Sequence, residues 1–173
     1  LLGALIAPAI VEAGVEDIPA HLFILYFGMM SMITPPIALA AFAASTLTKA
    51  DPMATGFAAM KFGWTAYLVP FLFVFSPTLI LFGEPADIAI DVTTVVIGTY
   101  YGSIAVVGYF VRNLNFAMRT ILGMAGLAAM CPHGLFDGAP IVIVVGVAVG
   151  AILLGFEFMT GRKPSKEAKV ETS

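Results

Sequence analysis

A threonine and two adjacent prolines stand inside an apolar segment that begins Ser-Met-Ile-Thr-Pro-Pro-Ile at Ser31. In an α-helix each backbone N–H bonds the carbonyl four residues earlier, and proline has no N–H. Pro35 and Pro36 are therefore expected to leave two carbonyls without donors. These carbonyls belong to Ser31 and Met32. Thr34 precedes a proline and is pushed towards extended geometry, so the pattern predicts a short unwound stretch.

Such a stretch offers binding sites for a cation and for an anion. Carbonyl oxygens grouped with the Thr34 hydroxyl form a hard-oxygen site suited to a small cation such as sodium, assisted by the negative end of the half-helix that stops there. A second half-helix is expected to begin directly afterwards, and the free N–H groups of Ile37 and Ala38 at its start favour an anion. The alternative interpretation is a proline kink that neighbouring helices repair.

The other polar side chains give weaker signals. His133 and Asp137 have the spacing of one helical face, but the prolines and glycines around them predict a tight outer turn rather than a metal site. Arg119 and Glu157 lie near cytoplasmic helix ends, where we expect them to anchor the chain at lipid headgroups. Cys131 is expected to act as a small apolar residue. The sequence has no catalytic triad, phosphate loop or paired intramembrane carboxylates, so we predict a protein that is not an enzyme and needs no cofactor besides sodium.

The composition places these residues in a membrane. Of the 173 residues 60% are hydrophobic and 11% charged, and the mean hydropathy is +1.01, far outside the usual range of soluble domains. The net charge of -3 gives no indication of nucleic-acid binding. The lipid bilayer is therefore the first predicted partner.

Continuous apolar runs, rather than alternating ones, predict membrane helices and exclude a β-barrel. The fold class we expect is an all-α, polytopic helix bundle with one discontinuous transmembrane helix. The predicted elements are a partial helix at 1–11, a broken span at about 20–47, an amphipathic interfacial connector at 48–61, spans at 62–82, 93–111, 114–131 and 139–159, and a disordered tail at 160–173.

Three local signals refine this interpretation. Asp51 is expected to cap a connector helix that starts at Pro52. Pro70 and Pro77 are expected to kink the 62–82 helix. All eight Lys and Arg residues fall in alternate connections or in the tail, which predicts a cytoplasmic C-terminus.

Residues 21–85 resemble the end of the large permease subunit of tripartite ATP-independent periplasmic (TRAP) transporters, most closely the fused permeases of the TAXI subtype. The marks of the resemblance are "ITPP", "ADPMATGFAAMKFGW" and "PFLFVFSPTLILFGEP". The later segment "GYFVRNLNFAMRTILGMAGLAAMCP" is similar to the extension of those fused proteins. We therefore expect the chain to be the C-terminal part of a longer protein.

The resemblance implies the C-terminal half of an elevator-type ion-transporter fold. Residues 1–47 would belong to the transport domain, 62–82 would be a scaffold-side helix and 83–159 a three-helix extension. Sodium would be held mainly by backbone carbonyls and the threonine hydroxyl, at Ser31, Thr34 and Ile37. The chain departs from the family pattern at Ser31, where the family usually has Gly, and at Ala38 and Ala40, where it usually has Gly and Asn.

The resemblance also implies location and partners. A multi-pass permease of the bacterial inner membrane would import organic acids delivered by a periplasmic solute-binding protein, together with a small permease subunit or its fused equivalent. Two alternatives stay open: a sodium/carboxylate symporter that needs no binding protein, and a membrane scaffold subunit that transports nothing.

Overall fold

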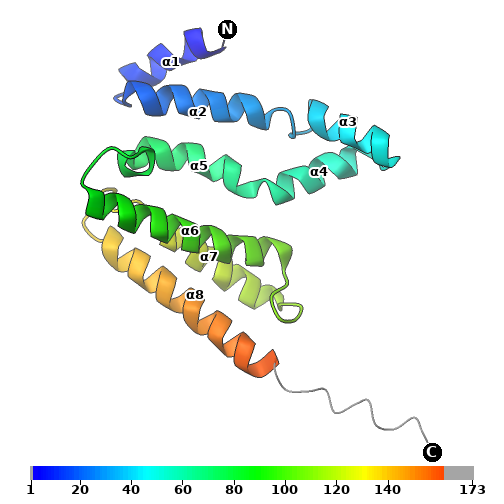
Figure 1. Cartoon of the computed structure of the whole chain (residues 1–173), viewed down its shortest axis with the longest axis vertical. Coiled ribbons are helices and arrows are strands. Elements are labelled where there is room, and N and C mark those ends of the chain that lie inside the picture. The colour runs from blue at the N-terminus through cyan, green and yellow to red at the C-terminus, as the bar shows by residue number, and fades with distance from the viewer. Residues whose placement is uncertain (1, 162–173) are drawn as a thin grey trace, which may run out of the picture. The chain divides into compact units, whose positions relative to one another are not determined.

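The described part of the chain is helical, which confirms the all-α part of the predicted class. The computed structural model describes residues 2–161, and over that range the one strand-like pairing is an isolated bridge between Tyr109 and Asn113. The elements in chain order (Figure 1) are α1 Leu2–Glu12, α2 Asp17–Met30, α3 Leu39–Thr48, α4 Pro52–Phe62, α5 Trp64–Phe75, the short 3₁₀ helix η1 Pro77–Ile80, α6 Pro85–Val107, α7 Phe116–Ala129 and α8 Ala139–Gly161. The predicted tail lies outside the described residues from 162 onward.

The chain forms two compact units, Leu1–Val92 and Thr93–Ser173. In the first unit α2 packs on α5 through aromatic rings. The Phe23 and Phe71 rings meet edge to face with their centroids 5.3 Å apart, and those of Tyr26 and Phe73 do so at 5.5 Å. Edge-to-face pairs of this kind fix the rotation of one helix against the other.

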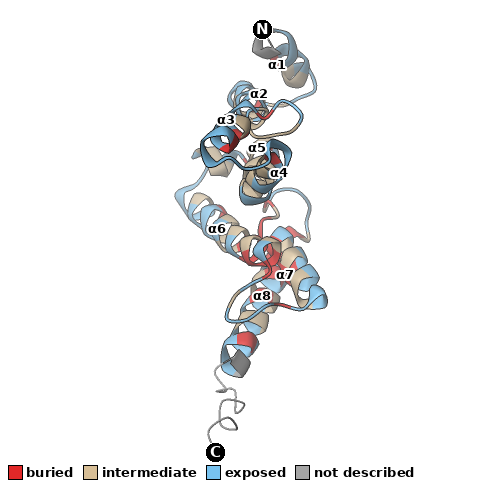
Figure 2. Cartoon of the chain, turned by 90° about the vertical axis from the view of Figure 1, so that its right-hand side faces the viewer, coloured by how far each residue is buried: buried red, intermediate tan, exposed pale blue. Residues whose placement is uncertain are grey.

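In the second unit, α6, α7 and α8 approach one another at glycines. A β-carbon built at Gly98 would lie 2.6 Å from the Gly126 carbonyl oxygen, and one at Gly146 would lie 2.8 Å from the Ala125 carbonyl oxygen. Buried residues of this unit gather around α7 (Figure 2). Small residues that let backbones come this close are typical of packed membrane helices.

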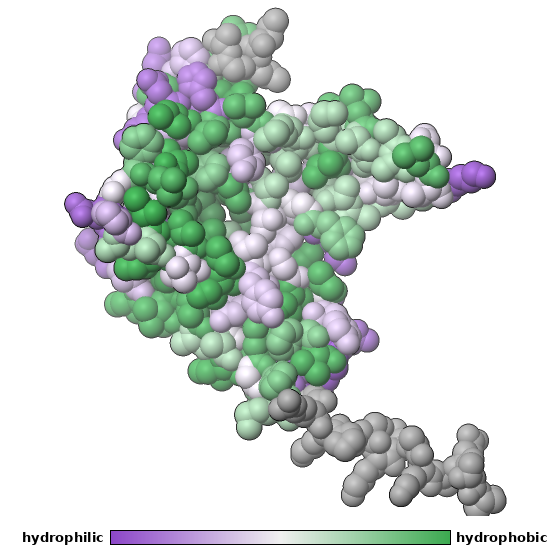
Figure 3. Space-filling model, viewed as in Figure 1, coloured by the Kyte–Doolittle hydropathy of each residue, from purple (hydrophilic) through white to green (hydrophobic). Residues whose placement is uncertain are grey.

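Apolar side chains face outwards over much of the surface (Figure 3). Phe116 is 80% exposed and Ile152 69% exposed, as lipid-facing positions of a membrane protein would be. Within residues 2–161, α6 and residues 139–159 of α8 are long and apolar enough to cross a bilayer. The pair α4 and α5, bent by 45°, would make a third span if taken together.

The predicted 62–82 helix is shorter than expected. Helix α5 contains Pro70 but ends at Phe75, Ser76 is extended, and Pro77 starts η1 instead of kinking a longer helix. Proline is tolerated at the first position of a helix because the N–H it lacks has no helical acceptor there. The first unit therefore contains a further helix discontinuity, at Ser76.

The connector helix has the predicted start. Asp51 accepts a hydrogen bond from the Ala54 N–H at 2.7 Å, and Pro52 occupies the first helical position. Helix α7 is shorter than the predicted 114–131 span. It begins after Asn115, whose side chain accepts from the N–H of Phe116.

The two polar anchors expected at lipid headgroups have protein partners instead, which corrects that expectation. The Arg119 guanidinium donates to the carbonyls of Ala105 (2.9 Å) and Val106 (3.2 Å), so it caps the end of α6. Glu157, 1% exposed, accepts two hydrogen bonds from Arg112 at 2.7 and 3.0 Å. This bond raises the pKa of Arg112, and the charged pair ties the 108–115 loop to α8.

Candidate functional site

The helical structure is interrupted between α2 and α3, where the double proline predicts a break. Helix α2 ends at Met30, α3 begins at Leu39, and turns fill the interval. The Pro35–Pro36 peptide bond is cis. This interval, residues 31–38, is called the break below.

Two backbone groups of the break are paired, contrary to expectation. The Met32 carbonyl accepts from the Ala40 N–H at 2.9 Å, so it is not left without a donor. The Ala38 N–H donates to the Thr34 carbonyl at 3.0 Å, and Ala38 is fully buried. Ala38 adopts a left-handed conformation with φ 32°, and the Met32–Ala40 bond joins the break to the first turn of α3. The Ala38 N–H is therefore not available to an anion.

The Ser31 carbonyl lacks its helical donor, as the sequence predicts. Its helical donor would be the N–H of Pro35, which proline lacks. The Ser31 hydroxyl donates backwards to the Gly28 carbonyl at 2.6 Å. The backbone oxygen of Ser31 is thus the carbonyl that the prolines free, while that of Met32 is satisfied within the chain.

The Thr34 hydroxyl has two partners. It donates to the Met30 carbonyl at 2.6 Å and lies 2.6 Å from the phenol oxygen of Tyr67 in α5. Because a hydroxyl has one proton, which goes to Met30, the Tyr67 hydroxyl must donate to Thr34. One lone pair of the Thr34 oxygen then stays open to a cation.

Tyr67 was missed by the reasoning from sequence. It stands 33 residues from Thr34, and no local pattern connects the two. Only the packing of α5 beside the break brings its hydroxyl to the threonine.

Helices α4 and α5 cover one side of the break. A β-carbon at Gly56 would lie 2.7 Å from Cγ of Pro35, and one at Gly63 would lie 3.1 Å from Cδ1 of Ile33. Ile37 of the break is 58% exposed. The break therefore contacts α4 and the α4–α5 junction at Pro35 and Ile33, and leaves Ile37 exposed.

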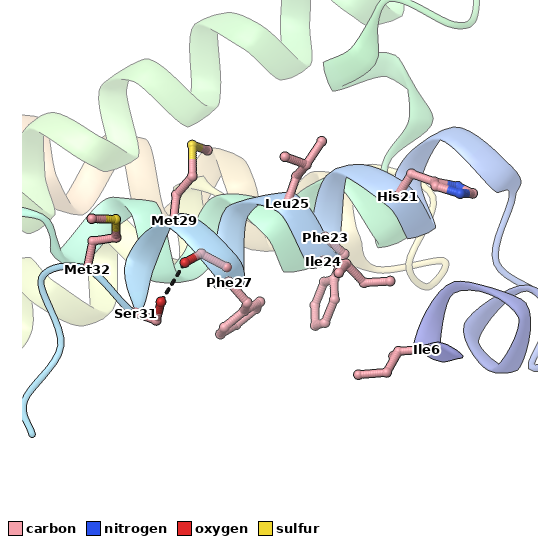
Figure 4. Close-up of a pocket in the computed structure, with 10 residues that line it drawn as sticks. Ile6, His21, Phe23, Ile24, Leu25, Phe27, Met29, Ser31 and Met32 are labelled. Carbon is pink, nitrogen blue, oxygen red and sulfur yellow. Dashed lines mark hydrogen bonds between the residues drawn. The ribbon is translucent and has the colours of Figure 1, made fainter. Parts of the chain in front are cut away.

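A groove of about 770 Å³ runs along α2 towards the break. Figure 4 shows Ile6 of α1 at one end and Ser31 with Met32 at the other. Its polar side chains are those of His21, which is hydrogen-bonded to the Asp17 carbonyl at 2.7 Å, and Ser31. The remaining lining is apolar and comes from Ile6, Phe23, Ile24, Leu25, Phe27, Gly28, Met29 and Met32.

The predicted site residues Ser31, Met32, Thr34, Ile37 and Ala38 all lie in the break. Within the described residues no group of three or more His, Cys, Asp or Glu side chains could hold a metal ion. The oxygens of the break are therefore backbone carbonyls and hydroxyls, a set that suits a weakly bound alkali cation better than a transition metal.

The turn between α7 and α8 holds the remaining candidates. His133 and Asp137 fall in this turn and not on a helix. Cys131, next to this turn, is half-buried.

A protein-family model matches the first part of the chain. Residues 1–85 match the family model described as the tripartite ATP-independent periplasmic transporter, DctM component. The match ends at Pro85, the first residue of α6, and includes the whole break. Neither the curated proteins nor the solved structures contain a match to the chain.

Proposed function

We propose that this chain is the C-terminal part of a TRAP transporter permease, of the TAXI-type fused class. In this proposal it imports organic acids, delivered by a periplasmic substrate-binding protein, by an elevator mechanism coupled to sodium. The small permease subunit, or a fused equivalent of it, completes the membrane component. The family match over residues 1–85 supports the transporter class, and the helical, apolar character of the described residues supports a place in the membrane.

The observation that carries the proposal is the break itself. Irregular backbone at membrane depth is tolerated where it is buried in protein or lines a polar cavity. Broken helices that meet in this way form the ion sites of many secondary transporters. The break lies within the residues that match the family.

The hydrogen bonds of the break favour some of the proposed sodium ligands over others. The Ser31 carbonyl and the Thr34 hydroxyl are the leading oxygens, because the Met32 carbonyl already accepts from Ala40. The carbonyl of Ile37, whose residue is exposed, remains a third candidate. Tyr67 would orient the Thr34 hydroxyl so that its open lone pair faces the ion.

Sodium binding tests the proposal directly. The full-length protein, purified in detergent, is heated in sodium chloride and in potassium chloride of equal ionic strength. We expect sodium, and not potassium, to raise the unfolding temperature. Thr34→Val, which removes the hydroxyl but keeps the shape, should abolish most of this sodium-specific shift.

Thr46→Val is the matched control. Thr46 lies in α3, outside the break, and its hydroxyl donates to the Ala43 carbonyl at 2.7 Å. This variant should keep the full sodium shift. Equal stabilisation by sodium and potassium, or an unchanged shift in Thr34→Val, would contradict a sodium site at the break and favour the scaffold subunit.

Uptake into proteoliposomes separates the two transporter alternatives. A TRAP permease should take up organic acids only when the substrate-binding protein is added on the outside. Sodium-driven uptake without that protein would instead support the binding-protein-independent symporter.

A further inference from the structure

Asp91 is a buried carboxyl group inside a helix that can cross the membrane. It is 4% exposed and stands seventh in α6, although its place in the sequence suggests a polar outer connection. An ionisable side chain within a span is costly, and such residues mark proton and ion pathways. Its role is not explained by the break between α2 and α3.

Two hydroxyls from the helix discontinuity at Ser76 contact the Asp91 carboxyl. Its Oδ2 lies 3.0 Å from Ser76 Oγ and within hydrogen-bond distance of Thr78 Oγ1. The two hydroxyl oxygens lie 2.7 Å from each other. The three oxygens therefore form a closed triangle in which each pair is in hydrogen-bond contact.

The number of protons decides how this triangle is held together. Each of the three contacts needs one proton between its oxygens. Ser76 and Thr78 supply one proton each, and an ionised carboxylate supplies none. With Asp91 ionised, one edge of the triangle would place two lone pairs face to face. With Asp91 protonated, all three edges are filled.

The cation that completes this ring is a proton, because a proton sits between two hydrogen-bonded oxygens and needs no further ligands.

We infer that Asp91, Ser76 and Thr78 form a site that binds one proton near the outer end of α6. The bound proton closes the hydrogen-bonded ring and holds η1 against α6. Its release would leave a negative charge inside the span and remove one bond of the ring, so proton loss and loosening of this junction are coupled. The inference does not depend on sodium binding at the break.

Few other titratable groups share the elements around Asp91. The sequence has no Lys, Arg or His from residue 62 to residue 111. Helix α5 carries Tyr67, nine residues before Ser76, and α2, which packs on α5, carries Asp17, His21 and Tyr26. Helix α6 itself carries Asp87, Tyr100 and Tyr101, and Glu84 directly precedes it.

Infrared spectroscopy of the full-length protein in lipid tests the inference. A protonated carboxylic acid has a carbonyl stretching band that is separate from those of carboxylates and amides. At neutral pH we expect such a band in the wild type and its loss in Asp91→Asn. Asp87→Asn is the matched control, because Asp87 is exposed one turn earlier on α6, and it should keep the band.

A second variant covers the case in which Asp91→Asn does not fold. Thr78→Val keeps the side-chain shape but removes one hydroxyl of the ring, so it should keep the band and shift its frequency. A neutral-pH spectrum with no band that Asp91→Asn removes would overturn the inference. So would a band that Thr78→Val leaves unshifted.

Discussion

A β-carbon on Gly56 would lie 2.7 Å from Cγ of Pro35, so α4 meets the break at a point with no space for a side chain. This contact adds to the hydrogen bonds that hold the break. Proline is rigid, and a glycine opposite it lets the two backbones come together. The connector helix is therefore part of the wall of the proposed ion site.

Gly56→Ala should destabilise the protein. The added methyl has no free volume, and overpacking of this kind costs roughly 1–3 kcal/mol. Gly28→Ala is the control, because a β-carbon there meets nothing within 4 Å and the alanine favours the helix by roughly 0.5–1 kcal/mol. Thermal unfolding of the two variants should move in opposite directions. A Gly56→Ala variant as stable as the wild type would mean that α4 can move away from the break.

Tyr67→Phe should weaken sodium binding without removing it. The substitution deletes the hydroxyl that donates to Thr34, a bond with a net contribution of about 1 kcal/mol, and frees the threonine oxygen to rotate. The sodium concentration that gives half of the thermal shift should therefore rise about 5-fold, the equivalent of about 1 kcal/mol.

Tyr26→Phe is the control for this variant, because the Tyr26 ring packs on Phe73 in the aromatic contact between α2 and α5. It should leave the sodium concentration unchanged. An equal effect of both variants would indicate general loosening of α5 rather than positioning of Thr34.

The contributions of Arg112 and Glu157 to the stability of the second unit should be coupled. Glu157→Gln leaves Arg112 without its carboxylate, so the unfolding temperature should fall. The double variant Arg112→Gln with Glu157→Gln removes both charges and should fall less than the sum of the two single variants. A double-mutant cycle measured by thermal unfolding gives this coupling. Strict additivity would show that the pair contributes nothing to stability.

Gly146→Ala should disturb the packing of α8. The β-carbon would lie 2.8 Å from the Ala125 carbonyl oxygen and from the Ala129 nitrogen, which are backbone atoms that move only with their helix. Gly155→Ala, nine residues later in the same helix, meets nothing within 4 Å. We expect a loss of roughly 1–3 kcal/mol in the first variant and none in the second. Reversal of this order would indicate that α7 and α8 are not in contact at Gly146.

The break was predictable from sequence because its cause is local. Pro35 and Pro36 remove N–H groups wherever they stand, and the structure has a helix end before them and a helix start after them. The fate of the freed carbonyls was not predictable in this way. The Met32 carbonyl accepts from the Ala40 N–H, and Ala38 between them adopts a left-handed conformation. No residue type in the motif predicts this conformation.

The partners of the polar side chains were harder to predict than the break, because they lie in segments that are distant in sequence. Asp91 belongs by sequence to a polar connection, and only its contacts with Ser76 and Thr78 reveal a buried group. Arg119 has the pattern of a lipid anchor, but its guanidinium reaches the end of α6. Local rules predict where a helix stops, whereas the partner of a polar side chain follows from tertiary packing.

The conformation of Ala38 restricts what evolution can place there. Residues with a β-carbon adopt φ 32° only at a cost, which glycine avoids, while full burial leaves no volume for anything larger than alanine. Two residue types therefore satisfy both demands, alanine with some backbone strain and glycine with none. Among natural variants of this chain, position 38 should drift between these two and tolerate no third.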